Sequence, residues 1–256
     1  MRYFFRLAFD GSKYKGWQHQ KNAKSVQDTL TEAITTYLRT PTEIIGCGRT
    51  DTGVHASNYY IHFDSAQALE QQDIMHLNAI LPSDIVVYEI ISVSEQSHAR
   101  FDAYERTYHY FIETRKNPFN RPYCFTYFPF NNVDRDLLNA AASLLLEYDD
   151  FSTFCKTHSG AKTKLCNITK SEWHFNKEGT SAYYTITANR FLRGMVRLIV
   201  GMCMNVGLKK ISLEEVKSSL EEHRPLSTPW SVPPAGLFLS DIKYPYVKQS
   251  EAIKLH

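Results

Sequence analysis

One acidic residue of the chain stands in a setting that suits catalysis. Asp51 lies within the segment Gly46–Ala56, which holds three glycines, at positions 46, 48 and 53. Glycines allow a tight backbone that closely approaches a ligand. With Arg49 and His55 on either side, Asp51 has the chemistry of a nucleophile or a base, although an Asx-type turn explains the same residues. The segment is therefore a candidate catalytic loop.

A second candidate is an arginine in the most apolar part of the chain. Arg197 stands within 190–205, which the sequence predicts to be one long, buried helix. A buried guanidinium requires a carboxylate or phosphate partner, and we expect Arg197 to pair with Asp51 and keep it ionised. Arg193 precedes Arg197 by four residues, on the same predicted helix face, and suits a side chain that reaches solvent.

Other catalytic chemistries find no support in the sequence. It contains no Gly-x-Ser-x-Gly, P-loop, His-Glu-x-x-His or Gly-x-Gly-x-x-Gly motif, so we expect neither a nucleotide cofactor nor a catalytic metal. The five cysteines form no C-x-x-C pair, which is typical of reduced thiols in a reducing compartment. A set of Cys155, His158, Cys166 and His174 matches no compact zinc motif, and we expect no metal there.

The composition is that of a globular protein with little overall charge. The net charge is only +2, so a nucleic-acid partner would be recognised through local patches. Two segments mix basic with aromatic or amide residues: 13–24, rich in lysine, and 156–164. Either is equally a solvated loop. The most apolar stretch, 195–206, is too short and too charged to span a bilayer, so we expect no membrane contact and a cytoplasmic protein.

The elements that must carry these residues follow one plan twice. Alternating and helical apolar patterns predict the order strand, helix, strand, strand, helix, strand, which is the split βαβ or ferredoxin-like order. The expected strands are 3–9, 43–46, 58–63, 84–93, 107–114, 167–175, 181–188 and 237–244. The expected helices follow Ser25, Asp134 and Ser212 as caps, and span 73–80 and 190–205.

These patterns predict an α+β protein of two ferredoxin-like domains. No apolar period crosses 102–105, so we place the domains at 1–104, with the catalytic loop, and 105–256, with the arginine helix. We expect a mainly antiparallel sheet with helices on one side and a central catalytic cleft.

Several short motifs, in order along nearly the whole chain, resemble the TruA family of tRNA pseudouridine synthases. They are Phe9-Asp10-Gly11-Ser12 with Tyr14 and Gly16-Trp17-Gln18; Ser25-Val26-Gln27; Gly48-Arg49-Thr50-Asp51 with Gly53-Val54-His55-Ala56; His98-Ala99-Arg100-Phe101 with Arg106, Tyr108 and Tyr110; Asp150-Phe151 with Phe154; Phe191-Leu192-Arg193 with Met195-Val196-Arg197 and Gly201; and Gly236-Leu237 with Leu239 and Tyr244.

The resemblance implies a homodimer that isomerises uridine to pseudouridine in tRNA, without a cofactor, at positions 38, 39 and 40 of the anticodon stem-loop. It implies that Asp51 is catalytic, that Tyr108 bounds the uracil and that Arg197 is the arginine partner. Arg49 matches an arginine that helps to open the stem and hold the flipped nucleotide. Further candidate RNA contacts are Lys13, Lys15, Trp17, Gln18, His55 and Arg193.

Two other functions compete with this interpretation. The ferredoxin-like plan is also that of RRM domains, so a non-catalytic RNA-binding protein is the alternative, although the aromatic motif of such domains is absent. A hydrolase with an aspartate nucleophile would need a second acid or a metal set near Asp51, and the sequence offers neither. Whether Asp51 attacks C1′, attacks C6 or removes the 2′-hydrogen stays open.

Overall fold

The contacts of the chain divide it into two compact units. The computed structural model describes residues 1–155 and 162–248. The first unit is Met1–Tyr104 together with the segment from Phe238 onward, and the second is Glu105–Leu237. The division after Tyr104 falls within the expected boundary region. The last strand groups with the first unit, whereas the sequence suggested that it belongs with 105–256.

The reason for that difference is a strand partner that periodicity does not reveal. β9 (Leu237–Lys243) pairs in parallel with β3 (His55–Asp64) at its beginning. Further along, Asn58 donates a hydrogen bond to Asp241 at 3.0 Å. Alternation along a strand predicts which side chains are buried, but it does not say which neighbouring strand supplies the hydrogen bonds.

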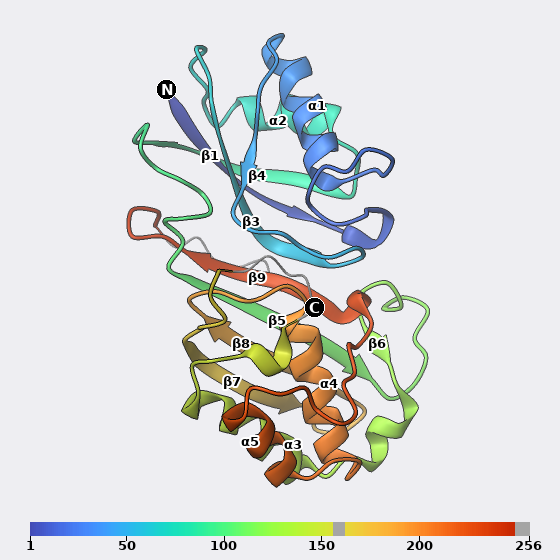
Figure 1. Cartoon of the computed structure of the whole chain (residues 1–256). Helices are drawn as coiled ribbons and strands as arrows, with labels where there is room; N and C mark the ends of the chain where they lie inside the picture. The colour runs from blue at the N-terminus through green and yellow to red at the C-terminus, as the bar shows by residue number, and fades with distance from the viewer. Residues whose placement is uncertain (156–161, 249–256) are drawn as a thin grey trace. The chain divides into compact units, whose positions relative to one another are not determined.

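The first unit is a mainly antiparallel sheet with two helices. β1 (Arg2–Phe9) lies between β3 and β4 (Ile85–Val93) and pairs antiparallel with both, while the short β2 (Ile45–Gly46) pairs with β3. Helices α1 (Val26–Leu38) and α2 (Asp73–Ile80) contact each other, and α2 packs on β4. Figure 1 shows both helices beside these strands.

Local sequence explains how this unit forms. Phe4, Phe5 and Leu7 of β1 are fully buried, because the strand is central in the sheet and both of its faces are covered. Ser25 caps α1 as predicted, with its Oγ accepting the Asp28 N–H at 3.1 Å. A stripe of buried side chains on one face then packs the helix against the core of the unit. Its members are Val26, Leu30, Ala33, Ile34 and Leu38.

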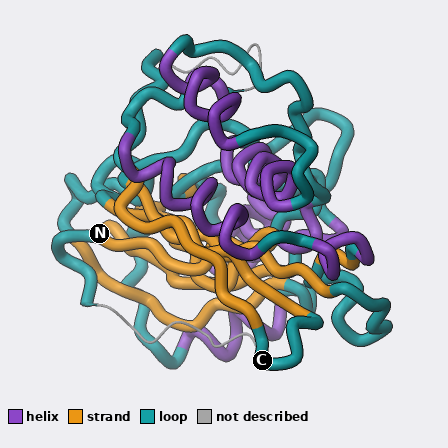
Figure 2. Tube along the Cα trace, turned by 90° about the horizontal axis from the view of Figure 1, so that it is seen from below, coloured by secondary structure: helices purple, strands orange, loops and turns teal. Residues whose placement is uncertain are grey.

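The second unit repeats the combination of antiparallel strands and helices. β8 (Ser181–Ala188) pairs antiparallel with β5 (Glu105–Glu113) and with β7 (Ile168–Phe175). A short strand that the sequence did not predict, β6 (Phe125–Thr126), pairs with β5. Helix α3 (Arg135–Leu144) contacts β7, α4 (Met195–Gly207) and α5 (Leu213–Glu221). Figure 2 colours the chain by secondary structure and distinguishes the strands from the helices that pack against them.

One predicted helix begins later than expected. The pattern predicted a helix from residue 190, but α4 begins at Met195, after Gly194 with a φ of 73°. The left-handed conformation of Gly194 interrupts helical geometry, so Arg193 lies before the helix and not one turn from Arg197. The prediction that the two arginines share a helix face is therefore wrong.

Two kinds of feature are absent from the residues that the structure describes. No helix within 1–155 or 162–248 combines the length and apolar character needed to cross a bilayer. Within the same ranges, no group of three or more histidine, cysteine, aspartate or glutamate side chains is placed to hold a metal ion.

Candidate active site

Asp51 lies in a loop whose ends are fixed by strands. β2 ends at Gly46 and β3 begins at His55, and Asp51 is half-buried between them. The carbonyl of Asp51 accepts the Val54 N–H at 3.1 Å, which closes a turn. The carboxylate is thus carried on a short turn between two strands of one sheet, with part of its surface open to a ligand.

A second loop, which follows the first strand, holds the candidate catalytic loop through backbone hydrogen bonds. The Trp17 N–H donates to the Thr50 carbonyl at 3.2 Å, and the Gly53 N–H donates to the Tyr14 carbonyl at 3.3 Å. Gly16 has a φ of 86°, and a Cβ there would lie 2.4 Å from the Thr50 oxygen. Only glycine fits this close approach, so the two loops pack with their backbones in direct contact.

His55 supports the loop from within the core. Its ring is 1% exposed and stacks on Phe238 at a centroid distance of 4.5 Å. Nδ1 lies 3.1 Å from the Gly11 nitrogen and 3.1 Å from the Asp10 carboxylate. It accepts from the former in one tautomer and donates to the latter in the other. Burial raises the pKa of Asp10, but hydrogen bonds from His55 and Ser12 outweigh burial and lower it.

Trp17 is also buried rather than presented to a partner. It is 2% exposed, and its ring lies 4.4 Å from that of Tyr59 and 6.3 Å from that of Phe9. The Tyr59 hydroxyl donates to the Gly48 carbonyl. We therefore interpret Trp17 and His55, both suggested as RNA contacts, as supports of the loop, because neither ring has an open face for stacking.

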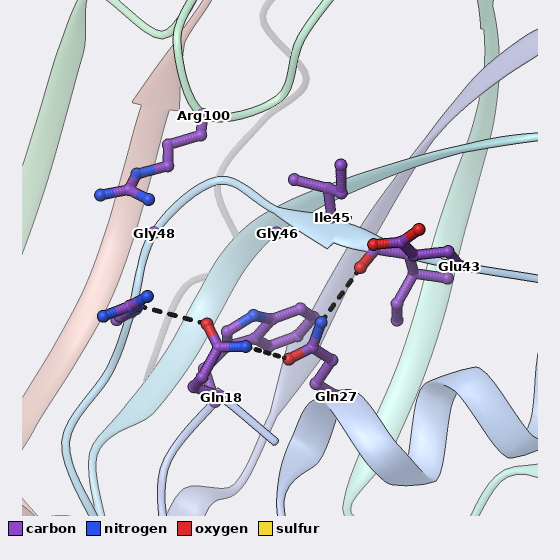
Figure 3. A pocket seen from close by; sticks show the side chains of 10 residues that line it. Gln18, Gln27, Glu43, Ile45, Gly46, Gly48 and Arg100 are labelled. Atoms are coloured by element: carbon purple, nitrogen blue, oxygen red, sulfur yellow. Dashed lines mark hydrogen bonds between the residues drawn. The ribbon is translucent and has the colours of Figure 1, made fainter. Parts of the chain in front are cut away.

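Arg49 lies beside a pocket of about 190 Å³. The side chain is exposed, and its Nε donates to Gln18 Oε1 at 3.2 Å. Figure 3 shows the pocket, in which Gln18 and Gln27 lie next to each other. The pocket is lined by Trp17, Gln18, Gln27, Glu43, Ile44, Ile45, Gly46, Gly48, Arg49 and Arg100. Arg49 and Gln18, predicted separately, are thus brought together.

Two further predicted contacts flank Tyr14 at the start of the supporting loop. Lys13 and Lys15 are both exposed. Lys13 Nζ lies 3.6 Å from a carboxylate oxygen of Asp84, and the Tyr14 hydroxyl donates to Asp84 at 2.6 Å. The exposed lysines keep the ability to meet phosphates, because an exposed ion pair of this kind is weak.

The remaining predicted site residues belong to the second unit. Arg197 lies in the first turn of α4, half-buried, and its Nε donates to the Val232 carbonyl at 2.6 Å. Tyr108 lies on β5, half-buried, with its ring edge-on to Phe191 at 5.1 Å. Arg193 is exposed before α4. The pairing of Arg197 with Asp51, which lies in the first unit, stays a prediction.

The cysteine and histidine set has other contacts where the structure describes it. Lys164 Nζ lies 3.2 Å from the Cys155 sulfur, and His174 lies 2.8 Å from Glu172. His158 is outside the described residues, as is Lys156 of the second basic patch.

Comparison with known proteins identifies the family. A family model described as tRNA pseudouridine synthase matches residues 141–245. tRNA pseudouridine synthase A of Bacteroides thetaiotaomicron is 44% identical over 255 residues, covering 99% of this chain and 94% of that protein. The chain belongs to the tRNA pseudouridine synthase A family. The enzyme of the same name from Bacteroides fragilis is 45% identical, covering 95% of this chain and 96% of that protein. The Bacillus subtilis protein is 34% identical, with 95% and 99% covered.

Family membership extends over the catalytic loop. The match to the family model begins at residue 141, so it includes Arg197 but not Asp51. The full-length relatives cover both residues. The resemblance drawn from the short motifs is thereby confirmed. Those motifs contained Gln27 and Arg100, but neither was given a role, since only the folded chain shows that both line the pocket beside Arg49.

Proposed function

We propose that this protein converts uridine to pseudouridine in tRNA, at positions 38, 39 and 40 of the anticodon stem-loop, without a cofactor. The observation that carries the proposal is the mounting of Asp51. Its loop is held by backbone hydrogen bonds to a neighbouring loop, and its relatives along the full chain are tRNA pseudouridine synthases A. A rigid mounting holds one carboxylate in a fixed position for a substrate that must itself be moved.

The reaction is an isomerisation, so atoms balance within the substrate. The bond between C1′ and N1 breaks and a bond between C1′ and C5 forms; a proton leaves C5, and N1 takes one up. A uridine within the stem is out of reach, so it must flip out of the stack, which costs a few kcal/mol. Asp51 then acts at C1′, at C6 or on the 2′-hydrogen, three routes that differ in the atom it touches.

The supporting roles follow from the positions of three other side chains. Arg197 holds the Asp51 carboxylate ionised; the bond from its Nε to Val232 fixes the plane of the guanidinium for this task. Tyr108 bounds the uracil ring, supported edge-on by Phe191. Arg49 helps to open the stem and to hold the flipped nucleotide, which offsets part of the cost of flipping.

The architecture extends the same proposal. In the first unit the sheet order β4-β1-β3-β2, with α1 after β1 and α2 after β3, supports a ferredoxin-like domain at 1–104. For a second domain at 105–256, the support is the chain order β5, α3, β7, β8, α4, β9, although the contacts of β9 group it with the first unit. We place the reaction in a central catalytic cleft, in a cytoplasmic homodimer whose RNA touches both subunits.

Asp51→Asn tests the catalytic assignment, since it removes the charge and keeps the shape. Tritium release from tRNA labelled at uridine C5 should be abolished, while binding of the same tRNA persists. The matched control is Asp136→Asn, the same change at an exposed carboxylate of α3, which should leave turnover near wild type. Turnover by Asp51→Asn would contradict the assignment. Wild-type protein that binds tRNA and forms no pseudouridine would favour the non-catalytic RNA-binding alternative.

A further inference from the structure

The pocket beside Arg49 is polar, and side chains of opposite charge lie at its two ends. Asp51 is not among its lining residues, although Gly48 and Arg49 of the same loop are. Among the described residues that line it, Arg49, Arg100 and Glu43 carry charged side chains. In Figure 3, Arg100 and Gln18 lie toward one end of the pocket and Glu43 lies at the other. One end is therefore cationic and the other acidic.

Two glutamines hold Arg49 at the cationic end in an orientation fixed by the backbone. Gln27 Oε1 accepts the His19 N–H at 3.0 Å, and Gln27 Nε2 donates to the Ile44 carbonyl at 3.1 Å. An N–H can only donate and a carbonyl can only accept, so the Gln27 amide has one allowed orientation. Gln18 must then donate to Gln27, at 2.9 Å, and turn its own oxygen to Arg49 Nε.

The backbone at the second arginine, Arg100, is also held by hydrogen bonds, in which histidine nitrogens are the acceptors. The N–H of Arg100 donates to His98 Nδ1 at 3.1 Å, and the preceding Ala99 N–H donates to His62 Nδ1 at 3.1 Å. The carboxylate of Asp102 accepts the His98 N–H at 2.7 Å. These bonds fix the backbone from which the exposed Arg100 side chain reaches the pocket that it lines.

Two guanidinium groups at one end of a pocket suit an oxyanion. Their planar forks match the oxygens of a phosphate, and an RNA strand offers one phosphate per nucleotide. The carboxylate of Glu43 at the other end repels a second phosphate, which limits the site to one. We propose that the pocket binds one phosphodiester of the RNA through Arg49 and Arg100, and that Gln18 and Gln27 are positioning residues that act through Arg49.

Such a contact fixes the register of the RNA, because it ties the backbone to a point two residues before Asp51 in the same loop. The identity of the RNA as tRNA rests on the proposed function. The phosphate site itself rests on the geometry of Arg49, Arg100 and the glutamines.

A linkage-by-linkage neutralisation of the RNA tests the phosphate contact. Anticodon stem-loop RNAs, each with one methylphosphonate, are measured for Kd with wild-type protein and with Arg100→Gln. In the wild type, one linkage near the target uridine should weaken binding about tenfold, as loss of a charge-assisted hydrogen bond does. Arg100→Gln should bind the unmodified RNA about tenfold more weakly, with a slope of log Kd against log salt reduced by about 0.7 to 0.9. Because only Arg49 then meets the phosphate, the variant should lose less affinity than the wild type when that linkage is neutralised.

The matched control for charge is Arg39→Gln, an exposed arginine at the end of α1 that does not line the pocket. It should keep the wild-type sensitivity to the same linkage. If Arg100→Gln loses as much affinity at that linkage as wild type does, or if base changes and not phosphate changes produce the pattern, the site does not bind a phosphodiester.

A second measurement separates positioning from general stability. Gln27→Leu should weaken RNA binding several-fold in the wild-type background and add nothing in an Arg49→Gln background, since it acts through Arg49. Equal losses in both backgrounds would overturn the positioning role. A wild type that shows the phosphate pattern without forming pseudouridine refutes the proposed function and leaves the phosphate site standing. Pseudouridine formation with no sensitive linkage does the reverse.

Discussion

The histidine behind the Arg100 loop should make the stability of the protein depend on pH. His62 is 3% exposed, accepts the Ala99 N–H and lies 4.6 Å from the ring of His98. Burial, followed by the nearby His98 and Arg2, lowers the pKa of His62 to about 4 from an ordinary value of 6.5. A charged ring here would lose its solvation and the acceptor nitrogen that holds Ala99.

The size and direction of the effect follow from linkage. When the pH falls below 6.5, the ordinary pKa of histidine, His62 of the unfolded chain binds a proton. In the folded chain His62 binds this proton only at about pH 4. The free energy of unfolding is therefore unaffected above about pH 7 and falls as the pH drops from 6.5 toward 4. At pH 5 the loss from this one group is about 2 kcal/mol.

His62→Asn isolates this contribution, because the Asn oxygen can accept the Ala99 N–H but does not titrate. Urea unfolding at pH 7 and pH 5 gives the loss for each protein. The wild type should lose about 2 kcal/mol more than the variant between these values. Burial also lowers the pKa of His109 to about 4, but His109 is present in both proteins and cancels. Equal losses in both would refute the reasoning.

Two other changes test the packing around α4. A Cβ at Gly201 would lie 1.8 Å from the Trp230 carbonyl oxygen, so Gly201→Ala should lower the stability by about 1 to 3 kcal/mol, whereas Gly48→Ala, with open space around its Cβ, should melt like wild type. Arg197→Met removes the donor to Val232 and should cost about 1 to 3 kcal/mol as well as turnover. Wild-type melting and turnover in Arg197→Met would contradict its role, and equal melting of the two glycine variants would contradict the packing argument.

Local features of the fold could be predicted from the sequence because they depend on neighbouring residues. The caps are an example: Asp134 accepts the Leu137 N–H at 3.2 Å, and Ser212 accepts the Glu215 N–H at 3.1 Å, each at the expected helix start. The strand 181–188 also has its predicted bounds.

Features that depend on distant partners could not be predicted. The left-handed conformation of Gly194 determines where α4 begins, and an apolar pattern does not indicate which residues have a positive φ. Trp17 and His55 were predicted to contact RNA from their neighbours in the sequence. Both are buried, which depends on how the core packs and cannot be inferred from the flanking lysines. The role of Gln27 required the positions of Ile44 and His19, which lie on other segments.

The backbone contacts between the two loops of the first unit have a consequence for how the chain becomes active. Trp17 and Thr50 are joined across 33 residues of chain, so the loop takes its shape only after the intervening helix has folded back. A peptide copied from 46–56 would lack this template, and a chain still being synthesised would carry Asp51 without aiming it. Main-chain atoms make these contacts, so the side chain at an exposed position such as Thr52 can change without breaking them. The fold itself then keeps the position of the Asp51 carboxylate.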